Sequence, residues 1–210
     1  MIPGQDYNHT FAPVARWDSI RFVLSLAAIH GWELQHIDIK TTFLNGVLKE
    51  DIYMRQPQIL GTGYWRLKKA LYGLKQAGRE FYYDMDNTYQ TVGFTRCETD
   101  WSVYHRRKAG NISLTTMSVD DITIASNSKD ESDRVVADIA TKYEITDNGD
   151  AHWLLGCKII RWRSRVLLKL DQERYTTTIL EAFGMSTCNP VSVPMVTCLT
   201  TEMCPKTETQ

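Results

Sequence analysis

The sequence predicts an α+β fold in which helices pack on an antiparallel sheet, and three observations support this prediction. With 210 residues and 43% hydrophobic content, the chain can bury a core as one domain, or as one domain with an appendage. Segments with helical spacing of apolar residues alternate with short β-branched runs. Residues 114–125 form an apolar run interrupted by Asp120 and Asp121, a pattern typical of a tight hairpin turn.

The first third of the chain predicts a helix followed by a strand. Asp18 or Ser19 is the candidate N-cap of the helix and Gly31 is its expected stop. The apolar positions at helical spacing are Ile20, Val23, Leu24, Ala27 and Ala28. Residues 34–39 then predict a strand that carries Asp38, so the simplest arrangement is a helix docked on a sheet.

The middle of the chain predicts a second helix and three strands. Residues 81–91 have helical character and run to Gly93. Residues 102–105 and 112–116 are expected to be strands, and the second of them leads directly into Asp120. A further strand follows Asp121, which completes the hairpin.

The last third predicts a helix, a hairpin and a final helix. Asp130 can cap a helix whose apolar face is Val135, Val136, Ile139, Ala140 and Tyr143. Residues 153–160 and 166–170 are expected to pair, and residues 175–183 to form a helix that ends at Gly184. We therefore expect a domain over residues 1–184 and an extended or disordered tail over residues 185–210.

Asp38, Asp120 and Asp121 are the candidate catalytic residues. If Asp38 lies on a strand next to the hairpin, the three carboxylates converge, and divalent cations that prefer oxygen ligands, such as Mg²⁺, would relieve their repulsion. That arrangement suits two-metal nucleotidyl transfer. The alternative is an ordinary turn at Asp120 and Asp121, with Asp38 as a charge at a strand edge.

The charge distribution limits how nucleic acid could bind. A net charge of −1 gives no overall attraction to a polyanion, so binding would depend on local patches. Two segments carry basic residues and no acid. Residues 66–79 contain Arg66, Lys68, Lys69, Lys75 and Arg79, and residues 151–170 contain Lys158, Arg161, Arg163, Arg165 and Lys169. Aromatic side chains accompany both segments, as in surfaces that meet phosphates and bases, and the alternative is a solvated basic face.

Other features argue against secretion, membrane insertion and zinc binding. The five cysteines contain no Cys-x-x-Cys pair, and the five histidines show no ligand spacing with them. The cysteines are expected to be reduced thiols of an intracellular protein. Neither a signal peptide nor an apolar run of membrane-spanning length is apparent.

Several blocks, in order, resemble a known family. They are residues 10–16, 19–21, 31–34, 38–46, 67–77, 119–122 and 155–156. Together they resemble the reverse transcriptase of copia-type LTR retrotransposons, over about residues 5 to 195. The resemblance implies a right-hand palm, an antiparallel sheet with packed helices, with partial fingers and the start of a thumb. It also implies an RNA template, a DNA primer and dNTPs as partners. The protein itself would lie in cytoplasmic particles or in the nucleus.

The resemblance also assigns roles. Asp38 and Asp120 would bridge two Mg²⁺ ions, for which Mn²⁺ could substitute, and Asp121 would complete the acidic cluster. The Ile39 carbonyl could add a metal ligand. Phe43 would be the bulky gate that excludes a ribose 2′-hydroxyl, the alternative being a core aromatic on a short helix.

Three further residues, Lys75, Gln76 and Arg79, would line the nucleotide and template side. Arg79 could contact phosphate through its planar fork or be a surface cation. Residues 154–156 resemble the turn that grips the primer end, which is compatible with an apolar strand meeting a glycine bend.

The chain also departs from the family pattern. Ser118 stands where an aromatic is usual, and Gly78 stands where a turn-fixing residue such as Pro is usual. The basic fingers hairpin expected upstream is missing, and so are the RNase H, integrase and protease regions of a longer polyprotein. Three functions therefore remain open: an RNA-directed DNA polymerase, a truncated relic that only binds nucleic acid, and a metal-dependent nuclease.

Overall fold

The fold is known from a computed structural model that describes residue 7 and residues 9–192. The chain divides into two compact units, residues 1–171 and residues 172–210. The first unit ends at Asp171, before the last helix, and the expected boundary after residue 184 stays a prediction. In the second unit, α4 spans Glu173–Ala182, and residues 185–192 that follow it form no helix or strand.

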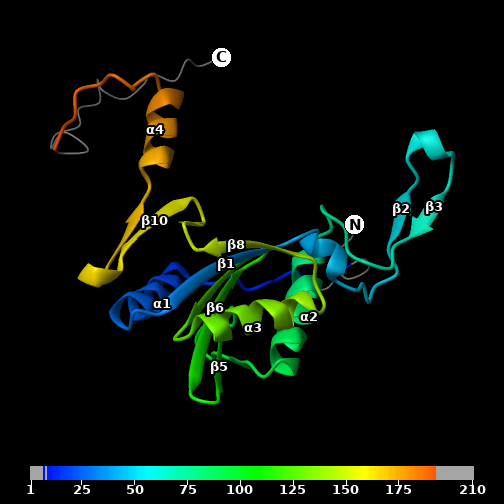
Figure 1. The fold of residues 1–210 in the computed structure, drawn as a ribbon. Coiled ribbons are helices and arrows are strands. Elements are labelled where there is room, and N and C mark those ends of the chain that lie inside the picture. The colour runs from blue at the N-terminus through cyan, green and yellow to red at the C-terminus, as the bar shows by residue number, and fades with distance from the viewer. Residues whose placement is uncertain (1–6, 8, 193–210) are drawn as a thin grey trace. The chain divides into compact units, whose positions relative to one another are not determined.

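The first unit is built on an antiparallel sheet of six strands, which confirms the predicted combination of an antiparallel sheet with helices (Figure 1). Its strand order is β4-β5-β6-β7-β1-β8. The strands are β1 (Glu33–Ile39), β4 (Thr95–Arg96), β5 (Val103–Lys108), β6 (Asn111–Ser118), β7 (Asp121–Ser126) and β8 (Ile145–Asp150). The central strands β7 and β1 therefore come from distant parts of the sequence.

One face of this sheet is covered by two helices. They are α2 (Ala77–Thr91) and α3 (Lys129–Ala140), and Figure 1 shows them beside the sheet. Ile37, Ile122 and Ile124 point from the sheet into the core that the helices close, and all three are fully buried. Alternation along a strand sends Gln35, Ile37 and Ile39 of β1 to this face.

The opposite face of the sheet changes character along its length. At one end, Leu34 and Ala125 pack with α1 (Trp17–Ile29) in a second core cluster. Toward the β6–β7 turn, the same face carries His36 and Asp38, which are only partly buried. The apolar end of this face packs against a helix, and its polar end stays partly exposed.

Two smaller sheets complete the first unit. Strands β9 (Trp153–Leu154), β10 (Cys157–Trp162) and β11 (Leu167–Asp171) form one of them, in the order β11-β10-β9. Strands β2 (Tyr53–Arg55) and β3 (Tyr64–Arg66) form a separate hairpin. Three short 3₁₀ helices lie between strands, at Thr42–Asn45, Gln58–Leu60 and Arg163–Arg165.

Several predicted boundaries were wrong. Helix α1 begins at Trp17 after Arg16, so Asp18 is not its cap but lies in its first turn, where a carboxylate suits the helix dipole. Helix α3 likewise follows Ser128 rather than Asp130. It ends at Ala140, and Tyr143 reaches the core from beyond the helix.

The predicted hairpin of residues 153–160 with residues 166–170 is confirmed in the pairing of β10 with β11, and the bend at Leu155 and Gly156 separates the short strand β9 from β10. Strand β8 was not predicted at all, although it pairs with β1 and is an edge of the main sheet.

Candidate active site

The three predicted aspartates lie together at the polar end of the sheet. Asp38 is near the end of β1 and pairs in register with Asp121 of β7. On the other side of β1, Asp38 faces Thr146 of β8, while Ser118 of β6 faces Asp121. Because paired residues on antiparallel strands share a face, Asp38 and Asp121 are on the same surface. We call Asp38, Asp120 and Asp121 the carboxylate trio.

Asp120 comes from the turn that joins β6 to β7. Val119 and Asp120 are the only residues between these strands. Val119 has a φ of 62°, which is unusual for a β-branched residue and marks local backbone strain. The Ile39 amide donates a hydrogen bond of 3.0 Å to the Asp120 carbonyl, so the turn is fastened to β1 beside Asp38.

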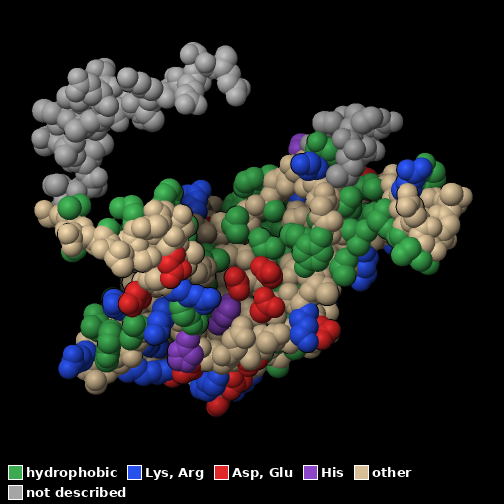
Figure 2. Space-filling model, turned by 90° about the horizontal axis from the view of Figure 1, so that it is seen from above, with side chains coloured by type: hydrophobic (Ala, Val, Ile, Leu, Met, Phe, Trp, Pro, Cys, Tyr) green, Lys and Arg blue, Asp and Glu red, His purple; other side chains and the backbone are tan. Residues whose placement is uncertain are grey.

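The carboxylate trio is electrostatically coupled. Partial burial raises the pKa of Asp38, and the neighbouring charges of Asp120 and Asp121 raise it further, while His36 acts in the opposite direction. Asp120 is exposed, and Asp38 and Asp121 are half-buried. Figure 2 shows acidic side chains gathered beside a histidine on one face of the molecule. The site therefore concentrates negative charge at an accessible surface.

His36 is a site residue that the sequence analysis did not identify. Its Nε2 lies 3.0 Å from Asp121 Oδ1, and its Nδ1 lies 3.3 Å from the side-chain nitrogen of Asn148. If Asn148 donates to Nδ1, the other ring nitrogen carries the proton and donates to Asp121. One signal in the sequence could have identified His36. Residues 36 and 38 are two apart on one strand, so their side chains share a face.

The donor set of the trio fits a hard divalent cation. Carboxylate oxygens are the ligands that Mg²⁺ prefers, and the repulsion that raises the pKa of Asp38 is what a cation would relieve. Within residue 7 and residues 9–192, however, no three His, Cys, Asp or Glu side chains are already grouped as metal ligands. His36 holds one oxygen of Asp121, so a cation there would have to compete with this contact.

Ile39 and Phe43 lie directly after the strand that carries Asp38. The Thr42 hydroxyl donates a buried hydrogen bond of 2.7 Å to the Ile39 carbonyl, which leaves that oxygen one further lone pair. Phe43 lies in the 3₁₀ helix Thr42–Asn45 and packs against Tyr72, with ring centroids 4.9 Å apart. It also packs against the buried core beneath the sheet.

Arg79 lies in a buried ion network. Its guanidinium donates to Glu50 at 2.7 Å and to the His9 carbonyl at 2.6 Å, and it also pairs with Glu80. Burial alone would raise the pKa of Glu50, but hydrogen bonds from Arg79 and Gln76 lower it. Gln76 is fully buried. The network ties α2 to the segment before β2. Arg79 is buried, so the alternative that it is a surface cation was wrong.

The predicted basic segments are only partly available to a ligand. Lys75, Lys68 and Lys69 are exposed. In the second segment, Arg163 pairs with Glu33, and Arg161 donates to the Ala27 carbonyl at 2.7 Å. These two cations of the segment are therefore engaged in contacts within the fold.

The glycine bend at residues 155–156 joins β9 to β10. Leu155 and Gly156 have φ values of 47° and 80°, so both adopt a left-handed conformation. Leu154 is buried in the cluster beneath α1, and Leu155 is exposed. The apolar strand meeting a bend was thus predicted correctly, and its primer contact stays a prediction.

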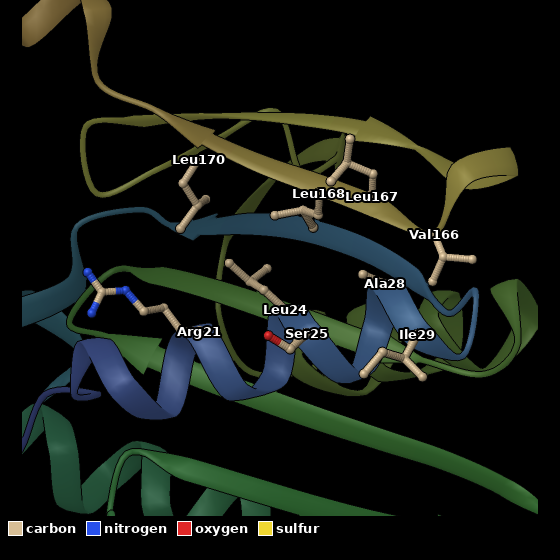
Figure 3. A pocket seen from close by; sticks show the side chains of 9 residues that line it. All are labelled: Arg21, Leu24, Ser25, Ala28, Ile29, Val166, Leu167, Leu168 and Leu170. Atoms are coloured by element: carbon tan, nitrogen blue, oxygen red, sulfur yellow. The ribbon is translucent and has the colours of Figure 1, made fainter.

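The structure also has an apolar groove away from the trio. It lies between α1 and β11 and encloses about 500 Å³. Figure 3 shows Leu24 of α1 and Leu168 and Leu170 of β11 turned toward the space between the two elements. No residue of the carboxylate trio lines this groove.

Two other predictions concern thiols and membranes. Cys97, Cys157 and Cys188 are free, as expected, while Cys198 and Cys204 lie outside the described residues. None of the helices within residue 7 and residues 9–192 is both long and apolar enough to cross a membrane.

Comparison with known proteins points to one family. The profile described as "Reverse transcriptase (RNA-dependent DNA polymerase)" matches residues 1–197. The Retrovirus-related Pol polyprotein from transposon TNT 1-94 of Nicotiana tabacum is 37% identical over 97% of this chain. The corresponding polyproteins from transposons RE1 and RE2 of Arabidopsis thaliana are each 34% identical, over 92% and 93% of the chain.

The match covers only a small part of each relative. The chain spans 16% of the tobacco polyprotein and 13% and 14% of the two Arabidopsis polyproteins. It thus corresponds to one segment of a much longer protein. The chain belongs to the reverse transcriptase (RNA-dependent DNA polymerase) family, as found in retrotransposon Pol polyproteins.

Proposed function

We propose that the carboxylate trio is the catalytic centre of an RNA-directed DNA polymerase of the copia type, which transfers a nucleotide from a dNTP to a primer 3′-hydroxyl. The observation that carries this proposal is the pairing of Asp38 with Asp121 beside the β6–β7 turn. It brings residues 82 or more positions apart in the sequence to one accessible surface, with the charge that a divalent cation would neutralise.

Each member of the trio would have a distinct part. Asp38 and Asp120 would hold two Mg²⁺ ions, or Mn²⁺ in their place, and Asp121 would complete the acidic cluster. The ions, when bound, would lower the pKa of the attacking hydroxyl and offset the charge on the transferred phosphoryl group. The free lone pair of the Ile39 carbonyl is a further candidate ligand.

Neighbouring residues would position the substrates. Phe43, braced by Tyr72, would limit the space beside the sugar and thereby favour deoxynucleotides. Gln76 and Arg79 would support this side of the site through the buried network with Glu50, and not through free side chains. Lys75 is exposed and would be able to meet phosphate.

A noncatalytic protein that binds nucleic acid is the second candidate, and two observations favour it. Asp121 is held by His36 rather than standing free beside Asp38. Ser118 also places only a small side chain next to Asp121, where the family usually has an aromatic. In this case the carboxylates would persist without supporting nucleotide transfer.

An end-labelled DNA primer annealed to an RNA template separates the candidates. The chain would be incubated with Mg²⁺, with and without dNTPs, and the primer length followed on a gel. A polymerase extends the primer only when dNTPs are present, and this is the expected result. Shortening without dNTPs would indicate a nuclease, and binding without either change would support the noncatalytic protein.

A further inference from the structure

The strands of the β2–β3 hairpin contribute no buried side chain to the first unit, since none of their six residues is buried. The hairpin has a register of Tyr53 with Arg66, Met54 with Trp65, and Arg55 with Tyr64. Its backbone pairing continues into the loop, where the Gln56 amide donates a hydrogen bond of 3.0 Å to the Gly63 carbonyl. The hairpin is thus an ordered element whose side chains are not needed for the core.

One face of this hairpin alternates aromatic rings with cations. Paired residues share a face, and so do residues two apart on one strand. Tyr53, Arg55, Tyr64 and Arg66 therefore lie on the same side, each tyrosine opposite an arginine. Tyr53 is 61% exposed and Tyr64 is 71% exposed, so both rings are accessible to a ligand. We call these four residues the Tyr–Arg face.

The charge around this face is positive. Arg66 pairs with Asp51, but Arg55 is exposed and makes no ion pair within residues 9–192. Lys68 and Lys69, just after β3, are exposed as well. The local excess of cations contrasts with the net charge of −1 of the whole chain.

We infer that the Tyr–Arg face binds a single-stranded stretch of nucleic acid, with tyrosine rings stacked on bases and arginines on the phosphates. Exposed rings alone would suit many apolar partners, and cations alone would be a solvated surface. Rings and cations alternating on one accessible face match a polymer of flat bases and regular negative charge. This inference rests on the proposed function for the class of polymer and adds a contact outside the carboxylate trio.

A protein partner would use a different part of the same hairpin. Its tip carries Ile59 and Leu60, which are 96% and 63% exposed. These side chains lack charge and rings, so they have little to offer a nucleic acid. The tip therefore provides an internal control for the Tyr–Arg face.

The test is the affinity of the full chain for a fluorescent oligo(dT) 12-mer and oligo(rU) 12-mer, measured by anisotropy in EDTA, where no divalent cation assists binding. Removing both rings in a Tyr53→Ala/Tyr64→Ala variant should weaken binding about tenfold or more, because each stacked base contributes through its ring. A Tyr53→Phe/Tyr64→Phe variant keeps both rings and should bind like the wild type. Arg55→Ala should reduce the slope of log K against log salt by about 0.7.

Several results would overturn the inference. These are no oligonucleotide binding by the wild type, equal affinities for the wild type and the double alanine variant, or a loss caused by Ile59→Ser and not by the tyrosine changes. The last result would place the oligonucleotide on the hairpin tip and not on the Tyr–Arg face. A wild-type chain that binds through the tyrosines but never extends a primer would refute the proposed polymerase and leave this inference standing.

Discussion

At the scale of single residues, the site depends on charges held close together. Asp38 and Asp121 are directly opposite on neighbouring strands, where like charges are destabilising. Burial and this repulsion raise the pKa of Asp38. Between the ordinary pKa of an aspartate and this raised pKa, the folded chain therefore keeps a proton that the unfolded chain has released. The metal-free protein therefore loses stability as pH rises from the ordinary pKa of an aspartate through the raised pKa of Asp38.

This balance predicts that Asp38→Asn stabilises the metal-free protein. The variant removes one like charge, and the gain in unfolding free energy should be about 0.2–1 kcal/mol near pH 7. The gain should shrink near pH 4, where the wild-type carboxyl is more protonated. Urea unfolding in EDTA at both pH values measures it, with Glu98→Gln as the control, since Glu98 is exposed and lies outside the helices and strands. A variant less stable than the wild type at pH 7 would contradict the electrostatic argument.

The sequence predicted that the three aspartates of the carboxylate trio lie together, but not the contacts that His36 and Arg79 make. The pair Asp120 and Asp121 in a hairpin, and Asp38 in a strand, carry local signals that survive without a structure. The contact of His36 with Asp121 joins residues 85 positions apart, and that of Arg79 with Glu50 joins residues 29 apart. No local pattern encodes such pairs, because they depend on which strands become neighbours.

At the scale of elements, α3 is fastened to the sheet by a buried ion network. Arg106 of β5 donates to Glu131 at 2.8 Å and to Asp138 at 2.7 Å, both on α3. The side chains of Arg106 and Glu131 are 3% and 1% exposed. Arg106 also donates to the Val92 carbonyl at 2.9 Å, just after α2. One guanidinium thus joins both helices to the sheet that carries the site.

We expect Arg106→Ala to destabilise the protein by about 3–5 kcal/mol, because Glu131 would be left buried with a weaker partner. Arg106→Lys should also be destabilising, since an ammonium lacks the planar fork that reaches several acceptors. The matched control is Arg107→Ala. Arg107 is the next residue and is exposed, so removing its side chain should change the unfolding free energy by no more than about 0.5 kcal/mol. Equal unfolding free energies for the two alanine variants would show that the network is not structural.

Strand β8 illustrates which elements sequence patterns cannot find. Residues 145–150 read Ile-Thr-Asp-Asn-Gly-Asp, with little apolar alternation, and four of the six are exposed. They become a strand because β1 offers an unpaired edge, to which β8 is added with a change of register between Gln35 and Ile37. Helices α1, α2 and α3 were found because each buries an amphipathic face, although their first turns were misplaced.

At the scale of the whole molecule, stability should reside in the first unit. Both hydrophobic core clusters are formed by residues before Asp171, and no residue of α4 is buried. A chain ending after Asp171 should therefore melt within about 2 °C of the full chain, which differential scanning calorimetry would measure. A drop of 10 °C or more would mean that the second unit stabilises the first.

The most direct test of the central claim is the rate of dTTP incorporation on a poly(rA) template with an oligo(dT) primer, in Mg²⁺ and in Mn²⁺. We predict metal-dependent incorporation by the wild type, and a loss of at least about 100-fold in Asp120→Ala. Glu98→Ala, which removes an exposed carboxylate on the loop between β4 and β5, should retain the wild-type rate. Equal rates for Asp120→Ala and the wild type, or no incorporation by a folded wild-type chain that binds the primer–template, would contradict the account.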